Sequence, residues 1–233
     1  MQICNPLTST ELDEVLDSTE LVDDAAVLDL GCGYGEVLFR AADRAKIHGI
    51  GVDLSPWMIA AAANHQRTRA PTSRLRWILG EASDFMPDSQ PDVAVCIGAE
   101  WVWHDFRGTT RALAGHLGHG GVAVVGAARL HTAADPDRVR RERGAVETID
   151  DQRHVLRAYG FEPIHRIDPD DAGWDSYLSR TADAARSWAD LYPGRASDQW
   201  VDDQADWSAA RQRDREVIGW SVWIARLDRA SRA

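Results

Sequence analysis

The sequence predicts an α/β fold in which a mostly parallel β-sheet is covered by helices on both faces, with a helical insertion before its last strand. Two observations carry this prediction. Short apolar runs alternate with helical patterns from residue 27 to residue 167, and one longer helical stretch then separates the last two apolar runs. Strands that alternate with helices form parallel sheets buried on both faces. The length of 233 residues suits one domain spanning residues 1–233.

Seven apolar runs are expected to form the strands, at residues 27–30, 47–54, 75–79, 92–98, 121–127, 161–167 and 218–227. Helices are expected at residues 8–17, 36–45, 56–66, 109–117 and 150–160. Ser55 followed by Pro56 is a favourable N-cap and first-turn pair for the third of these helices. The last two strands have no regular crossover helix between them, so antiparallel pairing is open to them.

Residues 168–214 break the regular alternation and are long for a connection without structure of its own. A stripe at helical spacing runs through the first half of this segment, at Tyr177, Thr181, Ala184, Trp188 and Leu191. Trp200 and Trp207 are seven residues apart and share a face of a second helix. We therefore expect two amphipathic helices laid over the sheet as a lid, with simple packing as the alternative explanation of the stripes.

The composition narrows the class of protein and its partners. The formal net charge of -11 disfavours nucleic acid as a partner, because an acidic chain repels phosphate backbones. The three cysteines form neither a disulfide framework nor a zinc pattern, and the histidines show no metal-ligand spacing. The N-terminus lacks the features of a secretory signal, and no apolar run approaches the length of a membrane span. We expect a cytoplasmic protein with a small-molecule partner and no bound metal; the oligomeric state is not predicted.

The first predicted strand leads into a glycine-rich loop, with Gly31, Gly33 and Gly35 at alternate positions. In an open parallel sheet, ligands bind at the carboxyl ends of the strands, where glycines allow close approach of the backbone. The G-x-G-x-G spacing differs from the G-x-G-x-x-G of dinucleotide-binding loops, and the G-K-[ST] of phosphate loops is missing. Asp29 precedes the loop, and its negative charge favours a cationic ligand over a pyrophosphate.

Acidic residues end the next two predicted strands as well. Asp53 closes the second strand, where a carboxylate can accept hydrogen bonds from ribose hydroxyls. Glu81 and Asp84 follow the third strand and are expected at the rim of the same pocket. This row of acids suits a nucleoside that carries a positively charged tail.

Five motifs together resemble those of class I S-adenosylmethionine-dependent methyltransferases. They are VLDLGCGYG, GVDLS, GEASDF, PDVAVCIGA and GGVAVVGA, and the resemblance extends in order and spacing over residues 25–161. It implies a Rossmann-like, seven-stranded sheet whose last strand is antiparallel. The later stretches AGWDSYL and GWSVWIARL also resemble, more faintly, a bacterial subgroup of small-molecule methyltransferases.

The resemblance also implies the contacts with S-adenosylmethionine. Asp29 and the backbone of Gly31 and Gly33 would hold the methionine end. The ribose hydroxyls would bind Asp53, and the adenine would meet Leu54 and either Glu81 or Ala82. The methionine and its reacting methyl group would face Gly98 and Ala99. A structural strand–helix turn without a ligand is the alternative for the glycine loop.

The residues after the fourth strand are candidates for the acceptor site. Three polar side chains could hold a substrate or take its proton: Glu100, His104 and Asp105. Trp101 and Trp103 could form an aromatic wall, and His131, after the fifth strand, is a further candidate base. The alternative is an aromatic loop packed on its neighbours, with His104 in solvent. Trp174 and Tyr177 of the insertion are expected to complete the acceptor pocket.

These observations predict a methyltransferase that uses S-adenosylmethionine and acts on a nitrogen or oxygen of a small molecule. The fold dictates no catalytic base, so a catalytically silent domain that binds S-adenosylmethionine stays open. An NAD(P)-dependent oxidoreductase is a weaker alternative because the glycine spacing disfavours a dinucleotide.

Overall fold

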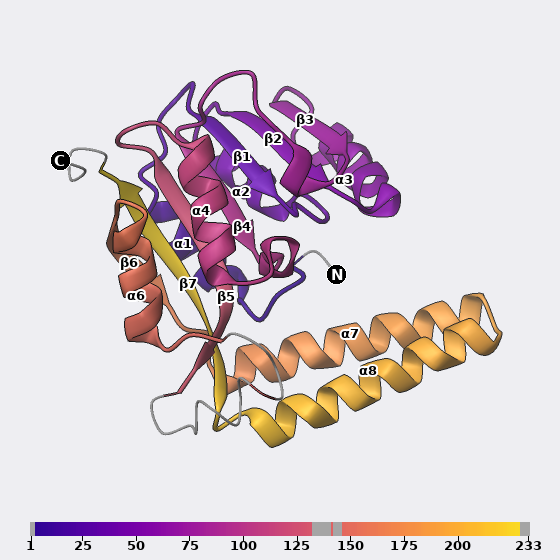
Figure 1. Ribbon diagram of the computed structural model, residues 1–233. Helices are drawn as coiled ribbons and strands as arrows, with labels where there is room; N and C mark the ends of the chain where they lie inside the picture. The colour runs from indigo at the N-terminus through magenta and orange to yellow at the C-terminus, as the bar shows by residue number, and fades with distance from the viewer. Residues whose placement is uncertain (1–2, 132–140, 142–145, 229–233) are drawn as a thin grey trace.

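The computed structural model describes residues 3–131, 141 and 146–228, and contains one seven-stranded sheet in the order β3-β2-β1-β4-β5-β7-β6 (Figure 1). Its strands are β1 (Ala26–Leu30), β2 (His48–Asp53), β3 (Arg74–Leu79), β4 (Val93–Ile97), β5 (Val122–Leu130), β6 (Phe161–Ile167) and β7 (Ile218–Leu227). Strands β1 to β5 pair in parallel, whereas β7 runs antiparallel to both of its neighbours. The predicted Rossmann-like sheet is confirmed.

The helices are α1 (Ser9–Asp17), α2 (Glu36–Arg44), α3 (Pro56–Arg69), α4 (Phe106–His116), α6 (Ile149–Ala158), α7 (Asp171–Leu191) and α8 (Arg195–Asp214), with short 3₁₀ helices η1 (Ala82–Asp84) and η2 (Glu100–Trp103). Ser55 caps α3 as predicted, accepting a hydrogen bond from the Met58 backbone. Helix α4 begins earlier than expected, because Asp105 accepts the Gly108 N–H at 2.6 Å and acts as its N-cap.

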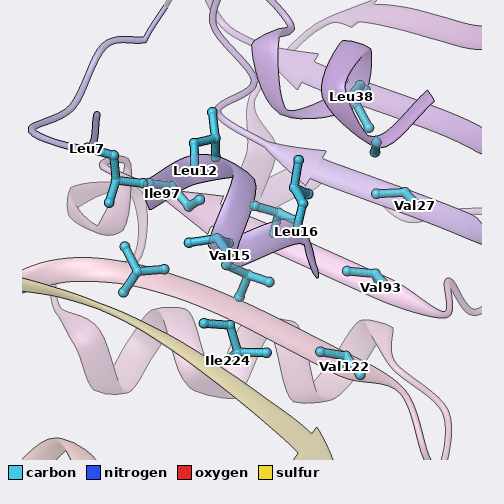
Figure 2. Close-up of a cluster of buried hydrophobic side chains, with 14 of the residues drawn as sticks. Leu7, Leu12, Val15, Leu16, Val27, Leu38, Val93, Ile97, Val122 and Ile224 are labelled. Carbon is cyan, nitrogen blue, oxygen red and sulfur yellow. The ribbon is translucent and has the colours of Figure 1, made fainter. Parts of the chain in front are cut away.

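Two apolar layers hold the helices on the two faces of the sheet. On one face, Leu12 and Leu16 of α1 and Leu38 of α2 pack against the strands (Figure 2). On the other face, Leu113 of α4 and Val155 of α6 belong to a second buried cluster. Because both faces are covered at the middle of the sheet, β4 is apolar and buried along its whole length, and β5 is so from Val122 to Ala127.

The pairing of β7 brings both ends of the helical insertion to the carboxyl edge of the sheet. Ile218, the first residue of β7, lies opposite Leu130, the last residue of β5. Strand β6 pairs antiparallel with β7, so it runs parallel to β5 and also ends at that edge. The insertion therefore leaves and re-enters the sheet on the side where the glycine loop lies.

Helices α7 and α8 form a long antiparallel hairpin that projects past the sheet (Figure 1, orange and yellow). The hairpin meets the rest of the molecule at its base, where Gly173 approaches the backbone oxygen of Pro6. Toward the tip the two helices pack on each other, and the Trp188 and Trp200 rings meet edge to face with 6.4 Å between centroids. The two predicted helices are present, but only their base covers the sheet.

Candidate active site

The glycine loop turns sharply between β1 and α2. Gly31, Gly33 and Gly35 all have positive φ, of 80°, 53° and 79°. A Cβ atom on Gly31 would lie 2.5 Å from Cβ of Ala99, and one on Gly35 would collide with the Trp77 ring. At Gly33 the nearest atom would be 3.7 Å away. Gly31 and Gly35 are therefore required by packing, whereas at Gly33 a Cβ would make only an ordinary contact with Met58 and the positive φ is what favours glycine.

Asp53, at the end of β2, accepts a backbone hydrogen bond on each of its two carboxylate oxygens. Its Oδ2 accepts the Gly33 N–H at 2.8 Å, and its Oδ1 accepts the Ser55 N–H at 2.8 Å. Each carboxylate oxygen has a second lone pair, so both can still accept a hydrogen bond from a ligand hydroxyl. The half-buried carboxylate thus ties the glycine loop to the start of α3.

Asp29, next to the last residue of β1, is a buried carboxyl group with an unused acceptor. Its Oδ2 has no hydrogen-bond partner among the described residues. Burial, with a further contribution from the Asp53 charge, raises the pKa of Asp29 to about 8. Asp29 lines a small cavity with Gly31 and Gly33, so a cation bound there would supply the missing partner.

An apolar surface adjoins Asp53. Leu54 follows Asp53 and is 57% exposed. Leu79 of β3 is also exposed and lies opposite Asp53 in the strand register. Glu81, two residues after Leu79, is half-buried, and Ala82 is buried. A flat apolar group could lie on this surface with a polar edge near Glu81.

A cavity of about 400 Å³ lies between the carboxyl edge of the sheet and the base of the hairpin. The loop after β4 contributes one wall of this cavity, through Gly98, Glu100 and Trp101. The hairpin contributes a second wall, through Trp174, Tyr177, Trp207 and Arg211. The rings of the hairpin wall contact one another, with centroid distances of 6.2 Å from Trp174 to Tyr177 and 5.6 Å from Tyr177 to Trp207.

Glu100 is the acidic group on the sheet side of this cavity. Burial raises the pKa of its carboxyl, although Oε1 accepts a long hydrogen bond of 3.4 Å from the Ala128 N–H. A half-buried carboxyl with a raised pKa can exchange a proton near neutral pH more readily than an exposed one.

Comparisons with known proteins agree with this geometry. A family model described as a methyltransferase domain matches residues 27–121. A methyltransferase from Geobacter sulfurreducens, solved with S-adenosyl-L-homocysteine, superposes with a TM-score of 0.86 at 25% identity, covering 97% of this chain and 93% of that one. A second, from Thiobacillus denitrificans and also in complex with S-adenosyl-L-homocysteine, gives 0.84 at 26% identity, covering 96% and 93%.

The chain is an S-adenosylmethionine-dependent methyltransferase with the class I, Rossmann-like fold. Among curated proteins, the uncharacterized protein YjhP of Escherichia coli is 26% identical over 231 residues, which cover 95% of this chain and 92% of that protein. The predicted enzyme class and the predicted cofactor are thereby confirmed. Within the described part of the methyltransferase, no group of side chains could hold a metal ion, and no helix is long and apolar enough to cross a membrane.

The methyltransferase brings some of the predicted acceptor residues together and leaves others apart. Four of them line the large cavity: Glu100, Trp101, Trp174 and Tyr177; Gly98, predicted to face the cofactor, lines it too. Trp103 packs instead against the second buried cluster, beside α4. His104 ends η2 with a φ of 75° and has an exposed side chain. His131 is half-buried outside the cavity lining, with Nδ1 3.1 Å from Nη1 of Arg129.

The sequence did not indicate that the N-terminal segment of the methyltransferase, residues 3–7, contributes to the site. Cys4 and Asn5 line both the small cavity at Asp29 and the large cavity, so the two cavities meet there. Buried Ile3 and Leu7 anchor this segment on the sheet, which an apolar pattern alone could have suggested. Arg211 and Trp220 also line the large cavity, but no local motif marks them.

Proposed function

We propose that this methyltransferase methylates a nitrogen or oxygen atom of a small molecule held in the cavity between the sheet edge and the hairpin. The observation that carries the proposal is the cavity itself, about 400 Å³ in volume and walled by Trp174, Tyr177 and Trp207. Pockets for small molecules have this size and this mixture of aromatic walls with few polar groups. The net charge of -11 supports a small acceptor rather than a nucleic acid.

We assign each part of the cofactor to the residues at the carboxyl edge of the sheet that could bind it. We infer that the amino group of the methionine end binds Asp29, whose buried oxygen lacks a partner among the described residues. We assign the backbone of Gly31 and Gly33 to the same end of the cofactor, because both glycines line the small cavity with Asp29. We assign the ribose hydroxyls to Asp53 and the adenine to the exposed surface of Leu54, with its edge near Glu81 and Ala82.

When bound, S-adenosylmethionine supplies an electrophilic methyl group on a sulfonium sulfur. The protein has to orient the acceptor atom toward that methyl and exclude water, which together supply much of the rate in such displacements. We place the acceptor atom near Gly98 and Glu100. The proton that an acceptor N–H or O–H loses moves to the Glu100 carboxylate. The methyl group's bond to sulfur breaks as its bond to the acceptor forms.

We also infer that the enzyme works in the cytoplasm. The three cysteines are free thiols: Cys32 and Cys96 are buried, and Cys4 is half-buried. Unpaired thiols of this kind are typical of reducing compartments.

The test is release of S-adenosylhomocysteine by the purified protein against a panel of small amines, phenols and alcohols. We expect turnover with at least one acceptor of a size that fits the cavity. Calorimetry with S-adenosylhomocysteine measures cofactor binding separately. Binding without release across the whole panel would favour the catalytically silent alternative.

A further inference from the structure

The hairpin wall of the large cavity carries buried donors without acceptors. Nε and Nη1 of Arg211 are buried, and neither has a hydrogen-bond partner within the described part of the chain. Nε1 of Trp174 is also buried and has no hydrogen-bond partner among the described residues. Buried donors of this kind destabilise a protein by the cost of their lost hydration, so a ligand whose acceptors reach them would stabilise this wall.

Contacts within the hairpin fix the position of these donors. The guanidinium of Arg211 stacks on the Trp174 ring, with 4.1 Å from Cζ to the ring centroid. The Trp174 ring in turn contacts Tyr177, which meets Trp207 edge to face. Trp207 and Arg211 are one turn apart on α8. The charge is therefore presented on a rigid aromatic support rather than on a flexible side chain.

The charge of Arg211 is only partly compensated. Burial lowers the pKa of Arg211, and the nearby Asp171 carboxylate offsets this only in part. Asp171 itself forms an ion pair with Arg215 at 2.9 Å. Asp214, three residues after Arg211, also lines the cavity and acts in the same direction as Asp171. Because burial and the charge of Arg215 together outweigh the carboxylates of Asp171, Asp214 and Asp175, a further anion at this wall would stabilise the guanidinium.

We propose that the acceptor is an organic carboxylate, bound through its carboxylate group to Arg211 and to Nε1 of Trp174. The inference rests on the proposed function and names its substrate class. Arg211 lies on the hairpin wall and Glu100 on the sheet wall, so the acceptor spans the cavity between them. Its carboxylate binds the hairpin, and its nitrogen or oxygen nucleophile reaches the Gly98 side. Aromatic walls alone would also suit a cation, but the unpaired donors favour an anion.

The experiment compares matched carboxylates and amides in the full-length protein saturated with S-adenosylhomocysteine. The probes are butanoate and butanamide, 4-aminobenzoate and 4-aminobenzamide, and indole-3-acetate and indole-3-acetamide. Binding is followed by calorimetry. We expect at least one carboxylate to bind tenfold or more tightly than its amide. Arg211→Gln should reduce that preference 10- to 100-fold and change amide binding less than about twofold, as expected for loss of a charge-assisted hydrogen bond.

Two further variants keep the test decisive. Arg213→Gln removes an exposed arginine two residues away and should leave the preference unchanged. Trp174→Phe keeps the ring but removes the Nε1 donor, and should weaken carboxylate binding about threefold to tenfold even if Arg211→Gln fails to fold. Equal or undetectable binding of both members in all three pairs overturns the inference. S-adenosylhomocysteine binding and methyl release, measured separately, would still support the proposed function in that case.

Discussion

The carboxylate of Asp53 accepts the backbone N–H of Gly33 at 2.8 Å and so connects the end of β2 to the glycine loop. The residue assigned to the ribose therefore also shapes the loop assigned to the methionine end. A substitution at Asp53 should affect both halves of the cofactor site at once.

We predict that Asp53→Ala weakens binding of S-adenosylhomocysteine by about 2–3 kcal/mol, because hydrogen bonds to a charged acceptor are lost and the Gly33 N–H loses its partner. Calorimetry measures the change. Asp43→Ala, an exposed carboxylate on α2, is the control and should bind like the wild type. If Asp53→Ala and Gly33→Val both bind normally, the cofactor site has been assigned to the wrong residues.

The second prediction concerns Asp29 and folding. Its pKa is raised from 3.8 to about 8, so the folded protein holds this proton more tightly than the unfolded chain does. The stability that Asp29 contributes is therefore fully present below pH 4 and is lost as pH rises toward 8. Relative to Asp29→Asn, the wild-type free energy of unfolding should fall by up to about 1.4 kcal/mol per pH unit in this window. Denaturation of both proteins from pH 4 to 9 gives these free energies. A difference between the wild type and Asp29→Asn that stays constant over this range would contradict the prediction.

The third prediction concerns the same carboxyl group and the cofactor. Below pH 8 the free enzyme holds Asp29 protonated, and binding of a cationic amino group must expel that proton. Affinity for S-adenosylhomocysteine should rise up to about tenfold per pH unit from pH 6 to 8 and then level off. Calorimetry in buffers of different ionisation enthalpy counts the released proton. Asp29→Asn should release no proton when S-adenosylhomocysteine binds. If the wild type also releases no proton, Asp29 does not bind the amino group of the cofactor.

Local patterns were enough to predict most of the fold. The apolar runs mark the strands, the glycines after α4 and α6 mark the ends of those helices, and Ser55 with Pro56 marks the start of α3. The early start of α4 was missed because its cap, Asp105, lies in a polar and aromatic stretch that was interpreted as a loop. Strand β5 extends to Leu130 because it pairs with β7 along its whole length, and that pairing is not visible in either segment alone.

The cofactor side of the site was more predictable than the acceptor side. Asp29, Gly33 and Asp53 belong to short motifs whose spacing has a meaning by itself. The acceptor cavity is assembled from segments far apart in sequence, such as Cys4 and Arg211, and their meeting depends on the fold. Helical spacing predicted two helices laid over the sheet but could not give their direction, and the hairpin that they form projects beyond the sheet instead (Figure 1).

The fourth prediction is that Glu100→Gln lowers turnover by ~10²-fold or more while affinity for S-adenosylhomocysteine holds. Because burial raises the pKa of Glu100, activity should fall on the acid side at a higher pH than an ordinary carboxyl would give. Glu162→Gln, an exposed carboxylate on β6, is the control. His104→Ala and His131→Ala are measured in the same series. Normal turnover of Glu100→Gln would leave catalysis to positioning alone or to one of these histidines.

The last prediction concerns the hairpin as a lid. Asp168 should be kept in any deletion, because it accepts a hydrogen bond from Ser221 at 2.6 Å and pairs with Arg166 at 3.0 Å. Replacing residues 171–214 with a short glycine-serine linker should abolish methyl transfer, since the wall formed by Trp174, Tyr177 and Trp207 is lost. Binding of S-adenosylhomocysteine should change little, because its assigned contacts come from the first four strands and the loops that follow them.

A second deletion separates the base of the hairpin from its tip. Replacing residues 182–203 with a glycine-serine turn removes the distal helices but keeps Trp174, Tyr177, Trp207 and Arg211 at the cavity. We expect this variant to retain turnover, because the tip packs mainly on itself. Both proteins are checked for cooperative unfolding before assay. Wild-type turnover without residues 171–214 would refute the lid, whereas loss of turnover in the shortened hairpin alone would assign a role to the tip.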